Sequence, residues 1–301
     1  MSHYLDDDKI KELEIQANDI RVTIIEALTE AGSGHTAGPL DMSDIFTALY
    51  FHILKHDPKN PAWPDRDRLV LSNGHICPVL YATMAHAGYF SVDEYKKTLR
   101  KFGSKFQGHP HREYMSALET SSGPLGSGLS QAVGMAIADR MDFGHDTKKY
   151  IYALLSDGEH DAGNTWEGAM LAGKERLHNL IAIVDRNNIQ IDGFTEDIMP
   201  LEPIADKWRA WNWHVQEING HDFAEIVHSI EEAKAVFEKP SVIIAHTIAS
   251  KGVSFAEKDF RWHGDPLGKR DVAGDPPKED QVRLALSELR ARGEELRKSK
   301  E

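Results

Sequence analysis

The chain has 301 residues, of which 41% are hydrophobic and 28% charged, with a formal net charge of −13 at pH 7. This length allows a large buried core in one or two domains, and the negative charge argues against nucleic acid or an anionic membrane as the main partner. The single cysteine, Cys77, leaves no disulfide framework. Residues 1–8 lack the basic and apolar regions of a signal peptide, and no apolar run approaches the roughly 18 residues of a membrane span. We therefore expect a cytoplasmic protein that does not enter a membrane.

The first half of the chain contains four expected helices and one expected strand. Helical periodicity extends over residues 9–31 and stops at Gly32, a residue type that commonly follows a helix end. A second helix is expected over 41–54, after Pro39. The first convincing strand is 68–72. Further helices are expected over 76–87 and 129–141.

The second half alternates strands and helices more regularly. Strands are expected over 150–155, 180–184, 214–218 and 241–246, and helices over 164–176 and 223–237. Such alternation predicts an α/β fold with a doubly wound, mostly parallel sheet and helices on both faces. After Asp275 and two prolines, a charged helix is expected over 279–297. We therefore expect one domain over residues 1–275 and a helical tail over 276–301.

Two of the expected strands end in residues that suit a metal ion and a diphosphate. Asp157 and Gly158 follow the strand 150–155, and Asn187 follows the strand 180–184. Parallel strands bring their carboxyl ends to one edge of a sheet, so a carboxylate and an amide oxygen would meet there. Two hard oxygens and a nearby carbonyl suit Mg²⁺. Gly158 would let backbone N–H groups approach an anion. Taken alone, the Asp-Gly pair at 157–158 is commonly only a turn, and the Asn-Asn pair at 187–188 is commonly only a loop.

Four of the sixteen histidines lie beside glycine in expected loops, namely His35, His75, His109 and His263. A loop beside glycine can bring an imidazole close to a ligand. Neutral imidazole accepts or donates a proton near pH 7, which suits proton transfer at sugar hydroxyls. Taken alone, each of these histidines is more readily explained as an exposed loop or cap residue, so a functional role depends on the surrounding motifs.

Those surrounding motifs resemble the transketolases. Residues 31–40 resemble the family's Ser-Gly-His-Pro-Gly-Ala-Pro segment, 71–75 its Leu-Ser-Asn-Gly-His, and 107–110 its Gly-His-Pro. Residues 123–128 are similar to Gly-Pro-Leu-Gly-Gln-Gly, and 262–268 to Ser-His-Gly-Ala-Pro-Leu-Gly. The segment from Ser156 to Asn187 resembles the magnesium–thiamine diphosphate motif, with Ser156 in place of its first glycine. All six segments occur in the family's order.

The resemblance implies a cofactor and a set of residue roles. The cofactor would be thiamine diphosphate, held through Mg²⁺ by Asp157, Asn187 and the carbonyl of Ile189. The residues that contact the cofactor would be Gly123, Pro124, Leu125, Gly158, Glu159, Asn187 and His263. The catalytic residues that surround the reactive thiazolium carbon and handle protons on donor and acceptor hydroxyls would be His35, His75, His109 and His263. Lys251 could face the diphosphate.

Two positions depart from the family pattern. The family carries Glu-Gly where this chain has Ala162-Gly163. The absent carboxylate belongs to a proton-linking network between paired active sites, to which Glu167 would also belong. Asp161 either compensates for it or the coupling is lost. In addition, His35 is followed by Thr-Ala-Gly instead of Pro-Gly-Ala.

The resemblance covers only the diphosphate-binding half of a transketolase. The family's chemistry also needs a glutamate on a pyrimidine-binding domain, and the residues after Gly268 are too few to form one. We therefore expect the N-terminal subunit of a split transketolase, forming a heterotetramer with a C-terminal, pyrimidine-domain subunit. The enzyme would transfer a two-carbon ketol unit from a ketose phosphate to an aldose phosphate, with pentose phosphates as the default substrates.

Three alternatives stay open at the level of sequence. The α subunit of a thiamine-dependent 2-oxo-acid dehydrogenase shares the cofactor and the fold, but the four histidine motifs argue against it. A non-catalytic, cofactor-binding subunit is a second alternative, suggested by Ala162. A nicotinamide dehydrogenase is the third. Residues 123–128 follow Gly-x-x-Gly-x-Gly instead of Gly-x-Gly-x-x-Gly, and no clear strand precedes them.

Overall fold

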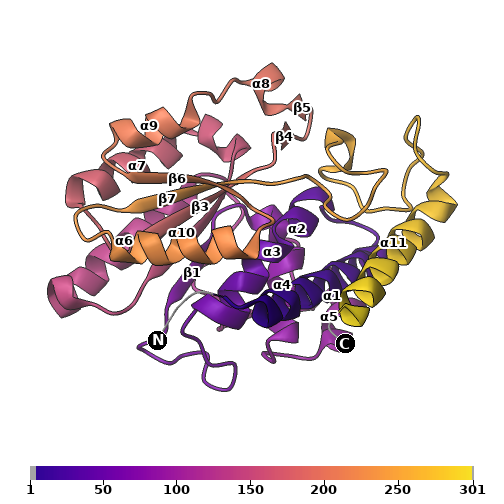
Figure 1. Cartoon of the computed structure of the whole chain (residues 1–301), viewed down its shortest axis with the longest axis horizontal. Coiled ribbons are helices and arrows are strands. Elements are labelled where there is room, and N and C mark those ends of the chain that lie inside the picture. The colour runs from indigo at the N-terminus through magenta and orange to yellow at the C-terminus, as the bar shows by residue number, and fades with distance from the viewer. Residues whose placement is uncertain (1–4, 300–301) are drawn as a thin grey trace.

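The computed structural model describes residues 5–299, and its centre is a five-stranded parallel sheet (Figure 1). The strands lie in the order β1-β2-β3-β7-β6, and each neighbouring pair is parallel. Their bounds are β1 Arg68–Leu71, β2 Ile151–Ser156, β3 Leu180–Arg186, β6 His214–Asn219 and β7 Ser241–His246. The prediction of a mostly parallel α/β sheet is confirmed. Residues 1–4 and the last two residues of the predicted tail lie outside the described residues.

Alternate side chains of the central strands enter two separate cores. On β2, Tyr152 and Leu154 belong to one core, whereas Ile151, Ala153 and Leu155 belong to the other. This follows from the two-residue period of a strand. Because both faces are covered, the strand is a continuous apolar run and lacks the apolar–polar alternation of a half-exposed strand.

Helices cover both faces of the sheet, as predicted. The first core receives residues from α1 Asp7–Ala31, α3 Ser43–Ala48, α4 Cys77–His86 and α10 Phe223–Ala235. The second receives residues from α6 Ser127–Phe143, α7 Gly163–Glu175 and α9 Ile204–Ala210. Figure 1 shows α7 and α9 on one side of the sheet and α1, α3 and α4 on the other.

The first helix has the ends that its sequence indicates. The carboxylate of Asp6 accepts a hydrogen bond from the Lys9 N–H at the start of α1. At the other end, Gly32 has a φ of 64° and its N–H donates to the carbonyl of Leu28. A left-handed glycine with this bond terminates a helix without steric cost. The predicted helix 9–31 is therefore confirmed.

The second predicted helix begins earlier than expected and is broken into three segments. These are α2 Ala37–Asp41, α3 Ser43–Ala48 and a π-helical segment, Leu49–Ile53. The expected start after Pro39 is wrong. Pro39 lies within the first turn of α2, where the N–H that proline lacks has no helical partner to lose.

Several short elements were not anticipated from the sequence. Helix α5 Val92–Thr98 begins at Ser91, whose hydroxyl accepts a hydrogen bond from the Glu94 N–H. Between β3 and α9 the chain forms a small hairpin, β4 Ile189–Gln190 with β5 Gly193–Phe194, followed by α8 Thr195–Ile198. These segments are too short to show a periodicity, and only the cap at Ser91 is visible in the sequence.

The C-terminal helix α11, Lys278–Lys298, packs along α1 (Figure 1). Its residues Ala285 and Leu289 are buried in the same core as α1. The Asn18 side-chain amide donates to the Leu289 carbonyl at 2.9 Å. The predicted helix 279–297 is therefore present and shares a core with the first helix.

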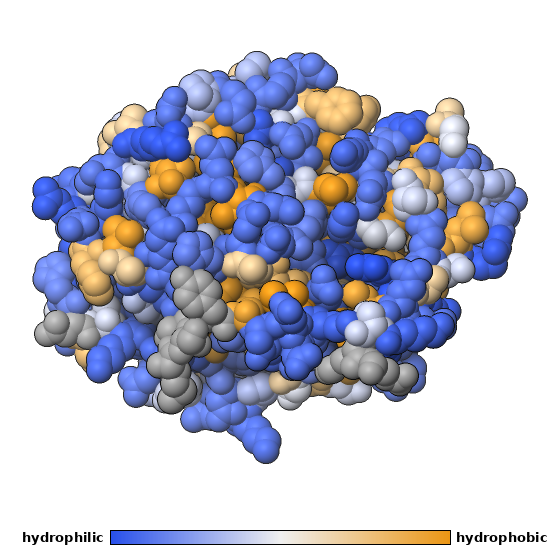
Figure 2. Space-filling view, in the orientation of Figure 1, coloured by the Kyte–Doolittle hydropathy of each residue, from blue (hydrophilic) through white to orange (hydrophobic). Residues whose placement is uncertain are grey.

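The visible surface is largely polar. Figure 2 shows a face dominated by hydrophilic residues, with apolar residues in small separate groups. Within residues 5–299, no helix combines the length and the apolar character that crossing a membrane requires.

Candidate active site

The carboxyl ends of the central strands open into a cavity of about 430 Å³. Its wall contains all four predicted histidines, together with residues 156–159 at the end of β2, and Asn187 and residues 189–192 after β3. A parallel sheet concentrates its functional loops at this edge. The six sequence segments that resemble one family therefore contribute to one wall.

Three of the histidines form a compact triangle. The ring centroids of His35 and His75 are 4.9 Å apart, those of His35 and His263 5.5 Å, and those of His75 and His263 5.4 Å. His109 lines the same cavity but is more exposed. These residues come from the loop after α1, the turn after β1, the 101–126 loop and the segment after Phe260–Trp262, so only the tertiary fold brings them together.

The histidine cluster is held in its neutral form. Burial lowers the pKa of His35 to about 3, with further lowering from His263, His109 and Arg100. Burial also lowers the pKa of His263 to about 4. The pKa of His75 is well below its usual value because of burial and the neighbouring histidines. Neutral imidazoles at pH 7 can accept or donate a proton at a substrate hydroxyl.

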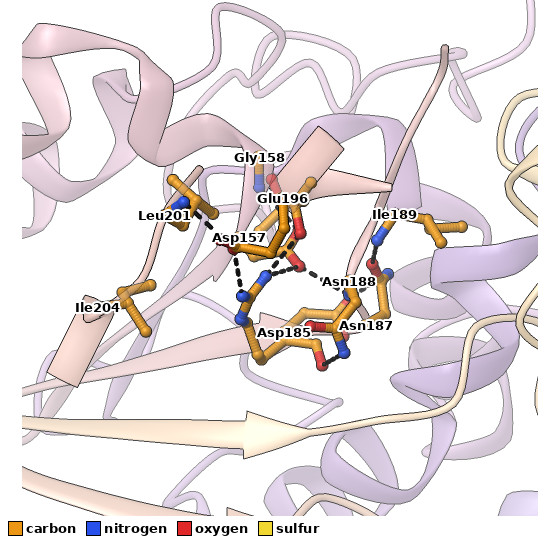
Figure 3. A network of polar contacts seen from close by, with 12 residues as sticks. Asp157, Gly158, Asp185, Asn187, Asn188, Ile189, Glu196, Leu201 and Ile204 are labelled. Atoms are coloured by element: carbon orange, nitrogen blue, oxygen red, sulfur yellow. Dashed lines mark hydrogen bonds and ion pairs between the residues drawn. The ribbon is translucent and has the colours of Figure 1, made fainter. Parts of the chain in front are cut away.

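Asp157 is fixed by three hydrogen bonds at the end of β2. Its Oδ1 accepts from the Gly158 N–H at 2.7 Å, and its Oδ2 accepts from the Asn188 N–H at 2.8 Å and from Arg186 Nη1 at 3.1 Å. The carboxylate is 1% exposed. Burial raises the pKa of Asp157 to about 6, although Arg186 opposes the rise. Figure 3 shows Asp157 beside the loop that begins at Asn188.

The amide of Asn187 is oriented by two buried carboxylates behind it. Its Nδ2 donates to Asp41 at 3.0 Å and to Asp185 at 3.1 Å, while its Oδ1 accepts from the Ile189 N–H at 3.1 Å. Thr247 donates to the other oxygen of Asp185. Because both amide hydrogens are engaged by carboxylates, the oxygen of Asn187 is directed away from them.

The same two carboxylates are difficult to ionise together. Burial and the nearby charge of Asp185 raise the pKa of Asp41 well above its usual value. Burial raises the pKa of Asp185 to about 8, although its hydrogen bond from Thr247 opposes the rise. Two carboxyl groups that share a buried site resist double ionisation.

The cavity has the donor chemistry that Mg²⁺ and a diphosphate require. Asp157, Asn187 and Ile189 all line it and offer a carboxylate, an amide and a backbone oxygen. Within residues 5–299, no group of three or more His, Cys, Asp or Glu side chains is arranged to hold a metal. A metal here would therefore need the amide and carbonyl oxygens in addition to Asp157. Buried Nδ1 atoms of His35 and His263 without partners among the described residues would suit a polar ligand.

Glu159, predicted to contact the cofactor, lines the cavity but its carboxylate is engaged by the protein. Its Oε1 accepts from the Ser72 hydroxyl at 2.5 Å and from the Gly126 N–H at 3.0 Å. Its Oε2 accepts from the Ser156 N–H at 2.9 Å and from the Ser156 hydroxyl at 3.3 Å. These four bonds use the acceptor sites of a carboxylate. Glu159 therefore ties together the ends of β1 and β2 and the start of α6.

The predicted glycine-rich segment forms another part of the wall. Gly123 and Leu125 line the cavity, whereas Pro124 does not. Gly126 has a φ of 80°, and an added Cβ there would lie 2.2 Å from Asn164 Oδ1. Glycine is therefore required at Gly126 both for the backbone angle and for the close approach of α7.

Three further residues with expected roles, Lys251, Asp161 and Glu167, do not line the cavity. Lys251 does not line the cavity, so the expectation that it could face the diphosphate is not supported. It lies at a separate cavity of about 280 Å³ together with Arg21 and His221. Asp161 and Glu167 are exposed, and Asp161 accepts a hydrogen bond from Gln190. The coupling role expected of these two residues stays a prediction.

Sequence reasoning missed three charged residues at the site. Asp41 orients Asn187, and Arg186 contacts Asp157, as described above. Arg100 has a left-handed φ of 59°, and its guanidinium packs against Gly108 beside His109. No carboxylate of residues 5–299 forms an ion pair with Arg100. No sequence pattern marks Arg100, but Asp41 and Arg186 both fall within or beside motifs and could have been considered.

Known proteins are similar to this chain in sequence and in fold. The family model described as "Transketolase, thiamine diphosphate binding domain" matches residues 13–278. A 6-deoxy-6-sulfo-D-fructose transketolase subunit of Clostridium sp. (strain MSTE9) is 44% identical over 282 residues, which is 94% of this chain and 98% of that protein. An apulose-4-phosphate transketolase subunit of Phocaeicola vulgatus is 38% identical over 290 residues, covering 96% of this chain and 98% of that protein.

A solved structure agrees with these matches. The transketolase of Campylobacter jejuni superposes with a TM-score of 0.79 at 34% identity, over 96% of this chain. The chain spans 48% of the length of that transketolase. The chain belongs to the transketolase thiamine-diphosphate-binding domain family, and the resemblance inferred from its motifs is confirmed.

Proposed function

We propose that this chain is the diphosphate- and magnesium-binding subunit of a two-chain transketolase. The observation that carries the proposal is the convergence of three neutral histidine rings and an oxygen-rich metal-ligand set on one cavity. Sugar hydroxyls need groups that accept and donate protons near pH 7, and a diphosphate needs a hard cation. The same cavity offers both.

In this proposal, the chain's residues divide into two groups. Asp157, Asn187 and the Ile189 carbonyl hold Mg²⁺ and through it the diphosphate, and Gly123, Leu125 and Gly158 let the backbone approach it. Thiamine diphosphate, when bound, supplies the carbon nucleophile and stabilises the two-carbon unit. Glu159 acts indirectly by fixing the 123–126 segment.

The histidines handle the protons of the substrates. His35 and His263 both line the cavity, and their lowered pKa values keep the rings neutral at pH 7. Each ring can therefore hold or move a proton at a hydroxyl that enters the cavity. The exposed ring of His109, beside Arg100, is placed to meet the part of the sugar that extends toward solvent.

The partner would be a pyrimidine-domain subunit that supplies the cofactor-activating glutamate, in a cytoplasmic heterotetramer. Relatives that this chain covers almost completely are themselves named as transketolase subunits. The sugars in their names carry a sulfonate or a phosphate, so we propose donors with an anionic group at the far end. Residues 1–275 would form the cofactor-binding domain, with 276–301 as a supporting helix.

Reconstitution tests this function. The full chain is combined with its pyrimidine-domain partner, thiamine diphosphate and Mg²⁺, and ketol transfer to ribose 5-phosphate is measured from xylulose 5-phosphate and 6-deoxy-6-sulfofructose. Transfer by the complex, and not by either isolated subunit, is expected. A stable complex that binds the cofactor but transfers from neither donor would favour a non-catalytic subunit, the alternative suggested by Ala162, or an oxo-acid donor.

Replacing Asp157 tests the metal site separately. Asp157→Ala should weaken Mg²⁺-dependent binding of thiamine diphosphate by more than about 100-fold, because loss of a direct ligand exceeds the typical effect of a supporting residue. Isothermal titration of the complex measures it. Asp206→Ala, which changes an exposed residue on α9, is the control. Equal affinity in the two variants would remove Asp157 from the metal site.

A further inference from the structure

Arg186, the last residue of β3, is a buried arginine that contacts the cavity-lining residue Asp157. Its side chain is 3% exposed. A guanidinium in such a place must be matched by several acceptors, because an unpaired buried charge is strongly unfavourable. The acceptors that bind the Arg186 guanidinium therefore indicate its structural role.

The guanidinium joins two parts of the molecule that are distant in sequence. Nη1 donates to Asp157 Oδ2 at 3.1 Å and to the Thr195 hydroxyl at 2.8 Å. Nη2 donates to Glu196 at 2.8 Å and to Glu202 at 2.9 Å. Nη1 therefore contacts both the proposed metal ligand and the loop that follows β3, and Nη2 contacts that loop alone.

That loop, residues 189–202, forms part of the cavity wall. Ile189, Gln190, Ile191 and Asp192 all line the cavity. The two glutamates that bind Arg186 also organise the loop. Glu196 accepts from the Leu201 N–H (Figure 3). Glu202 accepts from the Ile204 N–H. The loop is therefore built around the guanidinium.

On the other side, Arg186 limits how Asp157 can turn. Asp157 Oδ2 accepts from both Arg186 and the Asn188 N–H, whereas Oδ1 accepts only from the adjacent Gly158 N–H. Oδ2 is thereby anchored toward the loop, and Oδ1 keeps spare acceptor capacity. A change in the loop would alter the hydrogen bonds that fix this carboxylate.

We propose that Arg186 is a positioning residue that couples Asp157 to the 189–202 loop. Its hydrogen bonds fix the position of the Asp157 carboxylate relative to that loop. The planar fork of arginine is needed because it contacts four acceptors from one site. An ordinary surface ion pair would not have this effect. Glu196 and Glu202 are 42% and 52% exposed and contribute little by themselves, but the Arg186–Asp157 pair is buried.

Hydrogen exchange on the cofactor-free full chain tests the coupling without any dependence on function. Arg186→Met should raise amide exchange at least 10-fold in both the 156–160 and 188–202 segments. Arg186→Lys should give a smaller rise in both, because lysine keeps the charge and loses the fork. Glu202→Gln should raise exchange most in 188–202 and, through Arg186, to a smaller extent in 156–160. Arg140→Met, which removes a distant ion pair with Glu175, should change neither segment.

The pattern of exchange decides the outcome. Faster exchange in the loop alone, with 156–160 unchanged in both Arg186 variants, would make Arg186 a simple loop tether and overturn the proposal. Unchanged exchange in both segments would overturn it as well. If Arg186→Met does not fold, Arg186→Lys and Glu202→Gln still distinguish these outcomes.

A second measurement rests on the proposed function. The Mg²⁺ concentration for half-maximal binding of thiamine diphosphate to the two-subunit complex should rise at least 10-fold in Arg186→Met and less in Arg186→Lys. An unchanged Mg²⁺ requirement would overturn the coupling. Failure of the wild-type complex to bind the cofactor would contradict the proposed function instead, and the exchange measurement would still decide the role of Arg186.

Discussion

The chemistry of single residues in this site depends on burial more than on direct partners. His35, His75 and His263 are ordinary loop histidines in the sequence, but within the fold they share one small volume. Burial lowers the pKa of all three, and neighbouring histidines lower the pKa values of His35 and His75 further. Histidines that are neutral in the folded chain lower the stability at acidic pH, because the unfolded chain binds protons there more readily than the folded chain does.

The pH dependence of stability reports this cost. The pKa values of His35 and His263 in the folded chain, about 3 and about 4, lie below the usual value of 6.5. Between these limits the unfolded chain binds more protons, so the free energy of unfolding is retained above pH 6.5 and falls as the pH drops.

Replacing one histidine should reduce that fall. We expect His263→Asn to lose about 2 kcal/mol less than the wild type between pH 7.5 and pH 5, since each pH unit corresponds to about 1.4 kcal/mol for one proton. Urea unfolding at the two pH values measures it, and the contributions of groups that do not interact with His263 cancel in the comparison. An identical fall in both proteins would mean that His263 is protonated in the folded state.

At the scale of secondary-structure elements, the site depends on a close approach between helix α6 and the end of β1. An added Cβ at Gly128, in the first turn of α6, would lie 2.5 Å from the Ser72 Cα. Ser72 in turn accepts from the Gly128 N–H and donates to Glu159. A small residue thus lets three segments meet at the cavity wall.

Two glycines in the same helix give a matched test. Gly128→Ala should lower the free energy of unfolding by about 1–3 kcal/mol, because the added methyl overlaps the Cα and the side chain of Ser72. Gly134→Ala should raise it by about 0.5–1 kcal/mol, since alanine favours the helix and no heavy atom of the described residues lies within 4 Å of the added Cβ. Urea denaturation compares them. A similar gain in both variants would show that α6 can shift away from β1 freely.

At the scale of the whole molecule, the cavity lies at one edge of the sheet, with exposed apolar side chains beside it. Ile191 lines the cavity and is 66% exposed. Phe237, which is 70% exposed, lies just before β7. It is therefore at the amino ends of the parallel strands, opposite the carboxyl ends where the cavity lies. An interface that completes the cofactor site would cover the first residue and leave the second exposed.

Association with the proposed pyrimidine-domain subunit should discriminate between these two positions. Ile191→Asp should weaken binding to the partner at least 10-fold, because a charge would be buried at the interface. Phe237→Asp should leave binding unchanged. Sedimentation or surface-based binding of the purified subunits measures both. Equal effects at the two positions, or none at either, would contradict a partner seated over the cavity.

Much of this molecule could be predicted from sequence because the determining signals are local. Continuous apolar runs marked the strands, and their order with the helices indicated a parallel sheet covered on both sides. The ordered motifs identified the family and the four histidines that the fold gathers in one cavity. The short hairpin β4–β5 and the start of α2 were not predicted correctly, since elements of a few residues carry too little periodicity.

The sequence by itself determined the long helices and strands, the family and the residue types available for chemistry, because these depend on neighbouring residues along the chain. Only the tertiary structure decided their environment. It engaged the carboxylate of Glu159 within the wall, placed Lys251 at a different cavity, and set Arg186 between Asp157 and the following loop. Burial and distance between remote segments fix pKa values and hydrogen-bond partners, and neither is encoded in any short stretch of sequence.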